Sequence, residues 1–182
     1  MEKLVVTEFV SLDGVIEDPG GAEGYEHGGW TFRFDQGEGG RFKLDELMAA
    51  DAQLLGRRTY EGFAKAWPSI EDEAGFAEKM NAMPKFVVST SLGTAEWNNT
   101  TVLSGDLRAE VTKLKSDFTR DILVAGSAEL VQGLLREDLV DELRLMVFPL
   151  ALGTGKRLAS RAGRIRSPSG SFRWCTRATL RS

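Results

Sequence analysis

The chain alternates two patterns of hydrophobic and polar residues. Short, nearly continuous apolar runs rich in β-branched residues predict buried strands, and apolar residues recurring every three or four positions predict helices with one buried face. Strands are predicted at residues 4–10, 52–55, 85–91, 100–103, 121–125 and 143–150. Helices are predicted at 41–51, 59–67, 74–83, from 106 onward and at 128–135. Strands that alternate with helices are typical of an α/β protein.

The composition is that of one globular domain. A chain of 182 residues can bury one substantial core, and no Pro-rich or Ser-rich linker divides it. No apolar run approaches the length needed to cross a bilayer, so no membrane partner is expected. The N-terminal run lacks the features of a signal peptide, and the single Cys175 cannot form an internal disulfide. Both observations favour a cytoplasmic setting.

Charge is distributed unevenly along the chain. The formal net charge is -4, from 23 Lys and Arg against 27 Asp and Glu, and no acidic residue follows Glu142. A basic C-terminal tail can indicate nucleic-acid binding, but no recognisable binding module accompanies it and the body is acidic. We therefore expect no nucleic-acid partner. The single His27 has no Cys or second His near it, so no metal site is expected.

Residues 54–63 run from the end of a predicted strand through Gly56 into the start of a predicted helix. Such junctions hold phosphate in α/β proteins, because the first N–H groups of a helix lack partners within it. Arg57 and Arg58 offer guanidinium groups suited to phosphate oxygens, and Thr59 offers a hydroxyl. Two adjacent arginines are also typical of a solvated surface. An anion site and ordinary surface charge both remain open from this stretch alone.

A second junction of the same kind occurs at residues 121–132. A predicted strand is followed by a turn of small residues and then by a helix, so the backbone N–H groups after Gly126 would face a ligand. Ser89 and Thr90 lie at the end of the predicted strand 85–91, where their hydroxyls can contact a phosphate or turn the chain. Two junctions suited to phosphate are a stronger indication than one.

The segment from residue 17 to residue 40 is rich in glycine and carries four aromatic residues, Tyr25, Trp30, Phe32 and Phe34. One interpretation is a long mobile loop that covers a pocket through its aromatic anchors. The other is a surface loop whose rings pack on the core. The sequence leaves both open.

Five segments in sequence order resemble the dihydrofolate reductase superfamily, specifically the branch that includes the reductase domain of bacterial riboflavin synthesis and small uncharacterised reductases. Each segment alone is a weak signal, whereas five in order are fairly specific. The resemblance covers roughly residues 3–158. Its segments are Ser11 to Ile16, Leu55 to Tyr60, Val87 to Thr90, Val124 to Leu130, and Phe148 to Leu158.

The resemblance implies an α/β, three-layer fold with a mostly parallel central sheet and flanking helices, as in dihydrofolate reductase. It also implies NADPH as the cofactor, lying across the C-terminal ends of the strands. Two arginines favour NADPH over NADH, because the additional phosphate needs a cation. The implied cofactor-binding residues are Gly14, Val15 and Ile16 near the nicotinamide, Gly56, Arg57, Arg58 and Thr59 at the 2′-phosphate and pyrophosphate, Ser89 and Thr90 at the adenosine end, and Gly126, Ser127, Ala128 and Glu129 at the pyrophosphate turn.

The chain departs from the family pattern in two places. Dihydrofolate reductase carries an acidic residue in its first helix, and here Asp45 and Glu46 occur in that helix without aligning cleanly. The region 159–182 is rich in Arg and Ser where the family has an apolar strand pair, although 172–176 can form a short strand. We therefore predict a reductase-like domain at 1–158 and a divergent basic tail at 159–182.

The implied activity is that of an NADPH-dependent reductase that transfers hydride to a small heterocyclic or carbonyl substrate. Asp13 is the candidate catalytic residue. The substrate is expected to contact Trp30, Phe34, Phe148 and Gly153.

Two alternatives remain open for the function. The first is a non-catalytic nucleotide-binding or ligand-sensing module on the same fold, and the second is a structural oligomeric protein whose arginines are surface charge. Relatives of this kind are commonly homodimers, so a homodimer is expected, with the apolar strand 143–150 as an interface element.

Overall fold

A computed structural model describes residues 3–35, 37–159, 172–175 and 179–180, the last two ranges by their backbone. A parallel sheet of seven strands forms its centre. These strands are β1 (Leu4–Ser11), β3 (Ala52–Gly56), β4 (Lys85–Val88), β5 (Thr100–Leu103), β6 (Ile122–Ala125), β7 (Glu142–Phe148) and β8 (Phe172–Cys175). Two short strands, β2 (Phe34–Asp35) and β9 (Thr179–Leu180), form a separate antiparallel pair.

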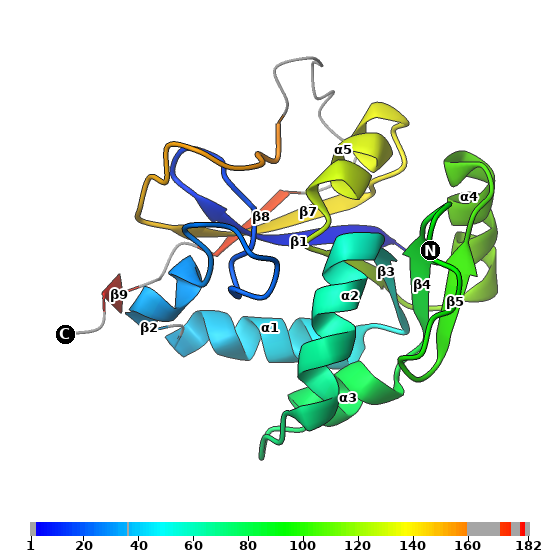
Figure 1. Ribbon diagram of the computed structural model, residues 1–182, viewed down its shortest axis with the longest axis horizontal. Helices are drawn as coiled ribbons and strands as arrows, with labels where there is room; N and C mark the ends of the chain where they lie inside the picture. Colours follow the sequence, from blue (N-terminus) through cyan, green and yellow to red (C-terminus); the bar gives the residue numbers. More distant parts are fainter. Residues whose placement is uncertain (1–2, 36, 160–171, 176–178, 181–182) are drawn as a thin grey trace.

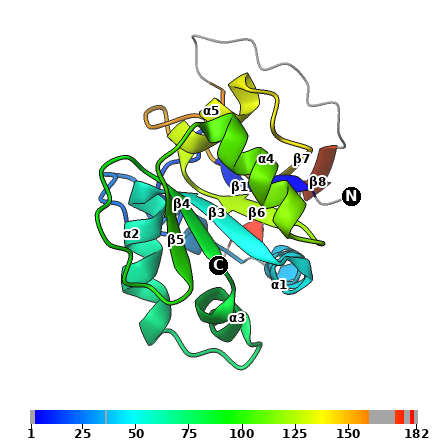
Figure 2. The same ribbon diagram turned by 90° about the vertical axis from the view of Figure 1, so that its right-hand side faces the viewer.

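Helices cover both faces of the seven-stranded sheet. They are α1 (Gly37–Ala49), α2 (Arg57–Ala66), α3 (Phe76–Ala82), α4 (Leu107–Asp117) and α5 (Ala128–Arg136), with short 3-10 turns at Trp30–Arg33 and Trp67–Ser69. Helices α1, α2 and α3 lie on one face, and α4 and α5 lie on the other (Figure 1). The view turned by 90° shows the same three layers (Figure 2). The predicted three-layer α/β fold is confirmed.

The two faces of the sheet are buried in separate cores. Alternate residues of β1 enter each core, with Val6 packing on the α4 and α5 side and Val5 on the side of α1, α2 and α3. Because a strand in the middle of such a sheet is buried on both faces, its sequence is almost continuously apolar. This burial explains why the apolar runs predicted the strands of the sheet within a few residues.

The order of the strands creates a switch point at the C-terminal edge of the sheet. The order is β5-β4-β3-β6-β1-β7-β8, so β3 and β6 are neighbours. The chain leaves β3 into α2 on one face and leaves β6 into α5 on the other face. In doubly wound sheets a ligand binds where consecutive helices depart to opposite faces. This position corresponds to the two junctions found in the sequence.

The first helix begins earlier than its apolar spacing predicts. The prediction started it after four residues rich in glycine, whereas α1 begins at Gly37. Glycine is a poor helix former in solution. At Gly39, however, an added Cβ would lie only 2.5 Å from the terminal methyl of Met146 in β7. The Met146 side chain therefore packs closely against the helix at Gly39.

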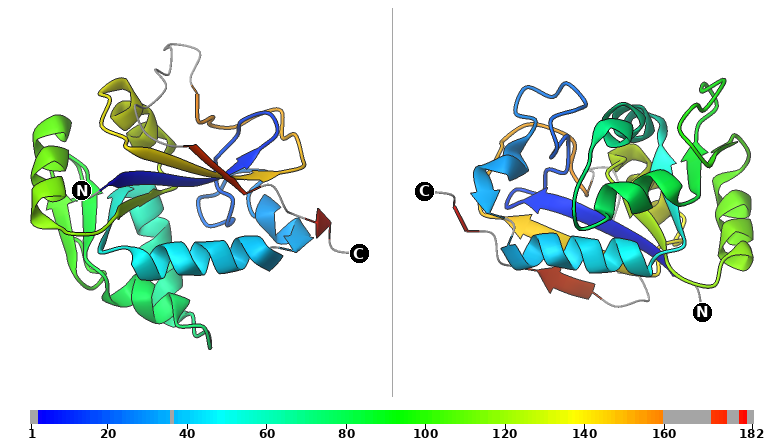
Figure 3. Two further views of the ribbon diagram at one scale, coloured as in Figure 1. Left: turned by 180° about the vertical axis from the view of Figure 1, so that it is seen from behind. Right: turned by 90° about the horizontal axis from the view of Figure 1, so that it is seen from below.

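The C-terminal region adds a strand to the edge of the sheet. The short strand suggested at 172–176 is present as β8, which pairs in parallel with β7 (Figure 3). As a result β7 is paired on both sides, with β1 and β8, and offers no open sheet edge to a second subunit. The rest of the predicted basic tail, 160–171, 176–178 and 181–182, lies outside the described residues, and the boundary after residue 158 stays a prediction.

Candidate functional site

The two junctions predicted to hold phosphate are joined to each other. The Gly56 amide donates a hydrogen bond to the Ser127 hydroxyl at 2.8 Å. The Ser127 amide in turn donates to the Thr59 hydroxyl at 2.9 Å. The starts of α2 and α5 are therefore held together, and the unpaired first-turn N–H groups of two helices converge on one place.

The backbone of the second junction explains its small residues. Gly126 and Ser127 both have left-handed conformations, with φ of 61° and 65°. A Cβ on Gly126 would lie 3.0 Å from the Thr59 methyl group, so a side chain at this position would force the two helix starts apart. Ser127 tolerates the left-handed conformation because both its amide and its hydroxyl are hydrogen-bonded to the first junction. Ala128, predicted in the same turn, is the buried first residue of α5.

The two arginines of α2 differ in what they contact. Both are exposed, and Arg57 pairs with Glu61 of the same helix at 3.0 Å. Arg58 forms no ion pair or hydrogen bond with a described residue. The pKa of Glu129, at the start of α5, is lowered chiefly by a hydrogen bond from Lys156 at 2.6 Å, with a smaller contribution from the charge of Arg58. Arg58 is thus the guanidinium available to an anion at this edge.

Ser89 and Thr90 follow β4, one strand farther from β6 than the first junction. The buried Ser89 hydroxyl accepts hydrogen bonds from the Ser91 and Leu92 amides at 3.2 and 3.0 Å. Ser89 therefore turns the chain in this structure, while Thr90 is exposed at the same edge.

Asp13 joins the loop after β1 to the loop after β7. Its carboxylate accepts hydrogen bonds from the Ser11 hydroxyl at 2.7 Å and from the Leu152 and Gly153 amides at 3.1 and 2.8 Å. The Ser11 hydrogen bond, followed by the two amides, holds the pKa of Asp13 well below its ordinary value. These contacts make Asp13 an anchor between two loops, and its predicted catalytic role stays a prediction.

The residues after Asp13 belong to the same pair of loops. Gly14 has φ of 83° and forms the turn. Val15 and Ile16 are buried, and they bind the opposite loop through a bridge from Val15 to Arg157 and a hydrogen bond from the Ile16 amide to the Lys156 carbonyl at 2.9 Å. This segment therefore presents a fixed backbone next to the strand ends.

Three residues predicted to contact the substrate pack mainly on one another. Phe148 meets Trp30 and Phe34 edge to face, with ring centroids 5.3 and 5.5 Å apart. The exposed fractions of Trp30 and Phe148 are both 0%, and the rings form a cluster distinct from the two main cores. For Trp30 and Phe34 the packing interpretation of the glycine-rich loop therefore holds, and contact of these rings with a substrate stays a prediction.

The glycine-rich loop is organised around the buried Asp18. Its carboxylate accepts hydrogen bonds from the Glu23 and Tyr25 amides at 3.0 and 3.1 Å. The Tyr25 hydroxyl donates to the Thr154 carbonyl at 2.9 Å, which ties the loop to the segment after β7. The loop thus has specific anchors on both sides.

Two carboxyl groups that the sequence interpretation did not single out lie at this edge. Glu8 of β1 is 1% exposed, and its Oε1 atom has no hydrogen-bond partner among the described residues. Burial raises the pKa of Glu8 well above its ordinary value. Glu23 accepts a hydrogen bond from the Thr59 hydroxyl at 3.1 Å, and desolvation raises its pKa. Glu8 could have been noticed in the sequence, because it is a charged residue within an apolar strand run. Glu23 could not, because its contact with Thr59 depends on the tertiary fold.

The acidic candidates on α1 are placed away from a catalytic role. Asp45 is exposed to solvent. The buried Glu46 accepts a hydrogen bond from the Thr7 hydroxyl at 2.7 Å and pairs with Lys43 and Arg144 at 3.2 and 3.3 Å. Glu46 therefore belongs to an ion network between α1 and the sheet.

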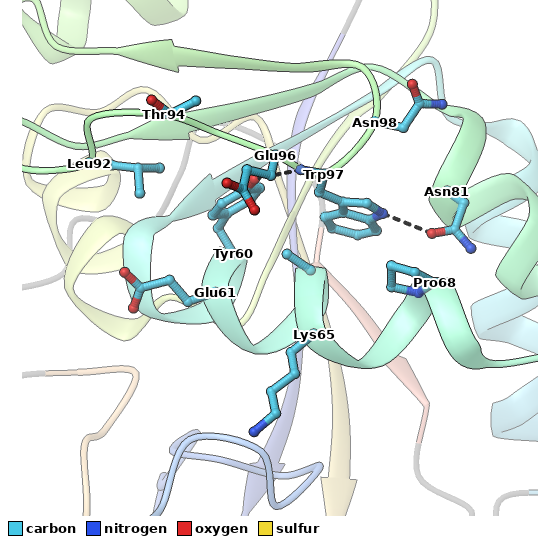
Figure 4. Close-up of a pocket in the computed structure, with 11 residues that line it drawn as sticks. Tyr60, Glu61, Lys65, Pro68, Asn81, Leu92, Thr94, Glu96, Trp97 and Asn98 are labelled. Carbon is cyan, nitrogen blue, oxygen red and sulfur yellow. Dashed lines mark hydrogen bonds between the residues drawn. The ribbon is translucent and has the colours of Figure 1, made fainter.

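A pocket of about 780 Å³ lies between α2, α3 and the loop after β4 (Figure 4). Trp97 forms part of its wall, where its indole N–H donates to the Asn81 side chain at 2.8 Å and its amide donates to the Tyr60 hydroxyl at 3.0 Å. None of the site residues predicted from the sequence lines it.

A doubly wound α/β domain with two glycine junctions joined at its switch point is the class that this geometry defines. The chain belongs to the family of the RibD C-terminal domain, which matches residues 2–176. This is a family of reductase-related domains, and the resemblance to the riboflavin-pathway branch of the dihydrofolate reductase superfamily is confirmed.

Individual relatives agree with this assignment. The uncharacterised protein YwjB of Bacillus subtilis (strain 168) is 31% identical over 153 residues, which are 84% of this chain and 80% of that protein. The uncharacterised protein YyaP of the same organism is 29% identical over 159 residues, or 86% and 79% of the two chains. A crystal structure from Shewanella sp. PV-4, provisionally named a riboflavin biosynthesis protein, covers 91% of this chain with 85% of its own, at 23% identity and a TM-score of 0.65, and so shares the fold.

Two further features bear on the class of protein. None of the helices in the described part of the chain combines the length and the apolar character needed to cross a bilayer. Within the same residues, no three His, Cys, Asp or Glu side chains gather in a way that could hold a metal ion.

Proposed function

We propose that this protein is an NADPH-dependent reductase that transfers hydride to a small heterocyclic or carbonyl substrate. The observation that carries the proposal is the direct connection of the two junctions through Ser127, which bonds to both Gly56 and Thr59. It brings two helix N-termini to the switch point of a sheet whose family is reductase-related. A bound nicotinamide would supply the hydride.

The residues at the edge fit a dinucleotide. The first-turn amides of α2 and α5 would receive the pyrophosphate, because helix N-termini carry unpaired donors and a partial positive charge. The exposed guanidinium of Arg58 has no described ion-pair partner and would receive the 2′-phosphate together with Arg57. Thr90 is exposed beside the turn fixed by Ser89 and would contact the adenosine end of the cofactor.

On the side of the expected substrate, the residues fix the positions of the loops, and the predicted Asp13 is not suited to donate a proton. Asp13 enters the proposal as the residue that fixes the loop after β1 against Gly153, because its lowered pKa leaves it without a proton near neutral pH. Phe148, Trp30 and Phe34 would support the substrate-binding region as a buried aromatic cluster. Among the described carboxyl groups, Glu8 and Glu23 have raised pKa values and would hold a proton closer to neutral pH.

Titration with NADPH while following the fluorescence of the four tryptophans tests cofactor binding. A saturable change at micromolar NADPH is the expected result. Oxidation of NADPH at 340 nm in the presence of pteridine, pyrimidine and quinone substrates then tests turnover. The absence of any saturable change would contradict the proposal.

One observation favours a second candidate, a non-catalytic nucleotide-binding or ligand-sensing module. The acidic residues that the sequence offered as candidates have structural partners. Asp13 anchors a loop, and Glu46 lies in an ion network. Such a module would bind NADPH without oxidising it against any member of the substrate panel. Measurable turnover separates the two functions.

The proposed enzyme works in the cytoplasm as a homodimer. Because β7 is enclosed by β1 and β8, the dimer would use a surface other than the edge of that strand. Light scattering of the purified protein measures the mass, and a mass equal to one chain of 20.0 kDa would exclude the dimer.

A further inference from the structure

The side chain of Glu23 lies at the junction that the proposed function assigns to phosphate. The Thr59 hydroxyl donates a hydrogen bond to Glu23 Oε1 at 3.1 Å. A Cβ built on Gly62, one turn along α2, would lie 3.7 Å from the Cβ of Ala22 and 3.9 Å from Glu23 Cγ. The loop therefore packs directly against the first turns of α2, and it brings a carboxylate to Thr59.

This position of Glu23 is built by the loop. The Glu23 amide is bound to the carboxylate of Asp18, which is buried and also binds the Tyr25 amide. Tyr25 is fixed to Thr154 on the other side. The carboxylate of Glu23 thus reaches Thr59 from an anchored backbone.

The charges that face Glu23 are mostly negative. Desolvation raises its pKa, the Thr59 hydrogen bond lowers it, and among the neighbouring charges Asp18 and Glu17 raise it whereas Lys156 lowers it. The charge of Glu23 also contributes to the raised pKa of Glu8, so these two carboxyl groups repel each other. Glu23 itself is exposed, so its carboxylate keeps contact with water while it accepts the hydrogen bond from Thr59 beside these like charges.

A second observation marks the same place as incomplete. Glu8 is buried next to the Gly126 backbone amide, and its Oε1 atom has no partner among the described residues. Buried carboxyl oxygens are almost always hydrogen-bonded in folded proteins. An unpartnered oxygen beside the second junction indicates that this edge is arranged for a group that the protein alone does not supply.

We propose that Glu23 holds the place of a cofactor phosphate at Thr59 and acts as a built-in competitor that sets the affinity of the site for anions. The inference rests on the proposed function. Thr59 has a single hydroxyl proton and can donate it to one acceptor at a time, while its oxygen accepts from the Ser127 amide. A phosphate oxygen and the Glu23 carboxylate therefore compete for one donor, and they also repel each other.

Replacement of the carboxylate by an amide tests the competition directly. Glu23→Gln keeps the size of the side chain and an acceptor for Thr59 but removes the charge. Calorimetric titration with inorganic pyrophosphate is expected to give an affinity roughly three- to tenfold higher for this variant than for the natural sequence, the range separating charged from neutral hydrogen bonds. Glu26→Gln, which makes the same charge change on an exposed residue of the same loop, is the matched control and should differ by less than twofold.

Each outcome decides the inference. Tighter pyrophosphate binding by Glu23→Gln alone supports it. Equal affinities for all three proteins, an equal gain in Glu26→Gln, or no binding of pyrophosphate to any of them would overturn it. A parallel titration with NADPH separates competition by Glu23 from the proposed cofactor. Tighter pyrophosphate binding by Glu23→Gln without any binding of NADPH would support the competition and contradict NADPH as the cofactor.

Discussion

The Ser127 amide donates to the Thr59 hydroxyl at 2.9 Å, and together with the hydrogen bond from Gly56 to Ser127 this contact joins the start of α5 to the start of α2 across two neighbouring strands. The two helices lie on opposite faces of the sheet (Figure 1), so the contact ties the two faces together at the ends of β3 and β6. The proposed phosphate site depends on this joint between the two helix starts.

Thr59→Val should weaken the joint. Valine keeps the shape of threonine but leaves the Ser127 amide without its acceptor, which is expected to cost about 1–2 kcal/mol in the free energy of unfolding. Urea denaturation measures the loss. Thr112→Val, which removes an exposed hydroxyl bonded within α4, is the control and should change stability by no more than about 0.5 kcal/mol. Equal effects of the two substitutions would argue against a special role for Thr59.

Asp13→Asn should lower stability in a pH-dependent way. Because hydrogen bonds from Ser11 and the two amides hold the pKa of Asp13 below its ordinary 3.8, the charged form contributes stability above that pH and loses it as the pH falls through the lowered pKa. The variant is expected to be about 1–2 kcal/mol less stable at pH 7, with a smaller difference at pH 3. Thermal unfolding at both pH values gives the comparison, with the exposed Asp117→Asn as control. A deficit that stays constant with pH would show that the charge of Asp13 is not responsible.

Glu8→Gln should have the opposite pH dependence. Burial raises the pKa of Glu8 above its ordinary 4.5, so the unfolded chain loses this proton before the folded chain does. Stability therefore falls as the pH rises from the ordinary value through the raised one, by at most about 1.4 kcal/mol per pH unit. Gln has no proton to lose. In urea denaturation, the free energy of unfolding of the variant should therefore rise relative to that of the natural sequence between pH 5 and pH 8. Parallel curves for the two proteins would contradict a raised pKa, and Glu78→Gln, on the exposed side of α3, controls for the change in net charge.

The sequence predicted the strands and the two junctions because both depend on local patterns, namely short apolar runs and glycine turns before helices. It placed the start of α1 too late, because a segment rich in glycine does not favour a helix by itself, and the contact of Gly39 with Met146 is distant in sequence. Similarly, the contact between Glu23 and Thr59 depends on how the loop folds back over α2.

Residue roles were harder to predict than residue positions. Asp13 stands in a recognisable motif, but the motif does not reveal that three hydrogen bonds keep its carboxylate charged. Trp30 and Phe148 were predicted at a substrate pocket, whereas their mutual packing emerges only when β7 and the glycine-rich loop meet. Patterns of residue type locate such a site, and the tertiary structure decides which atoms remain available.

Calorimetric titration of the natural sequence and of two arginine variants with NADPH and NADH is the most direct test of the proposed cofactor site. Arg58→Ala removes the guanidinium without a described partner at the start of α2, and Arg136→Ala removes an exposed one at the far end of α5. We expect saturable NADPH binding that Arg58→Ala weakens roughly tenfold or more, with little change in NADH binding and no change in Arg136→Ala. No saturable binding of NADPH, or an equal effect of both substitutions, would contradict the proposed cofactor site.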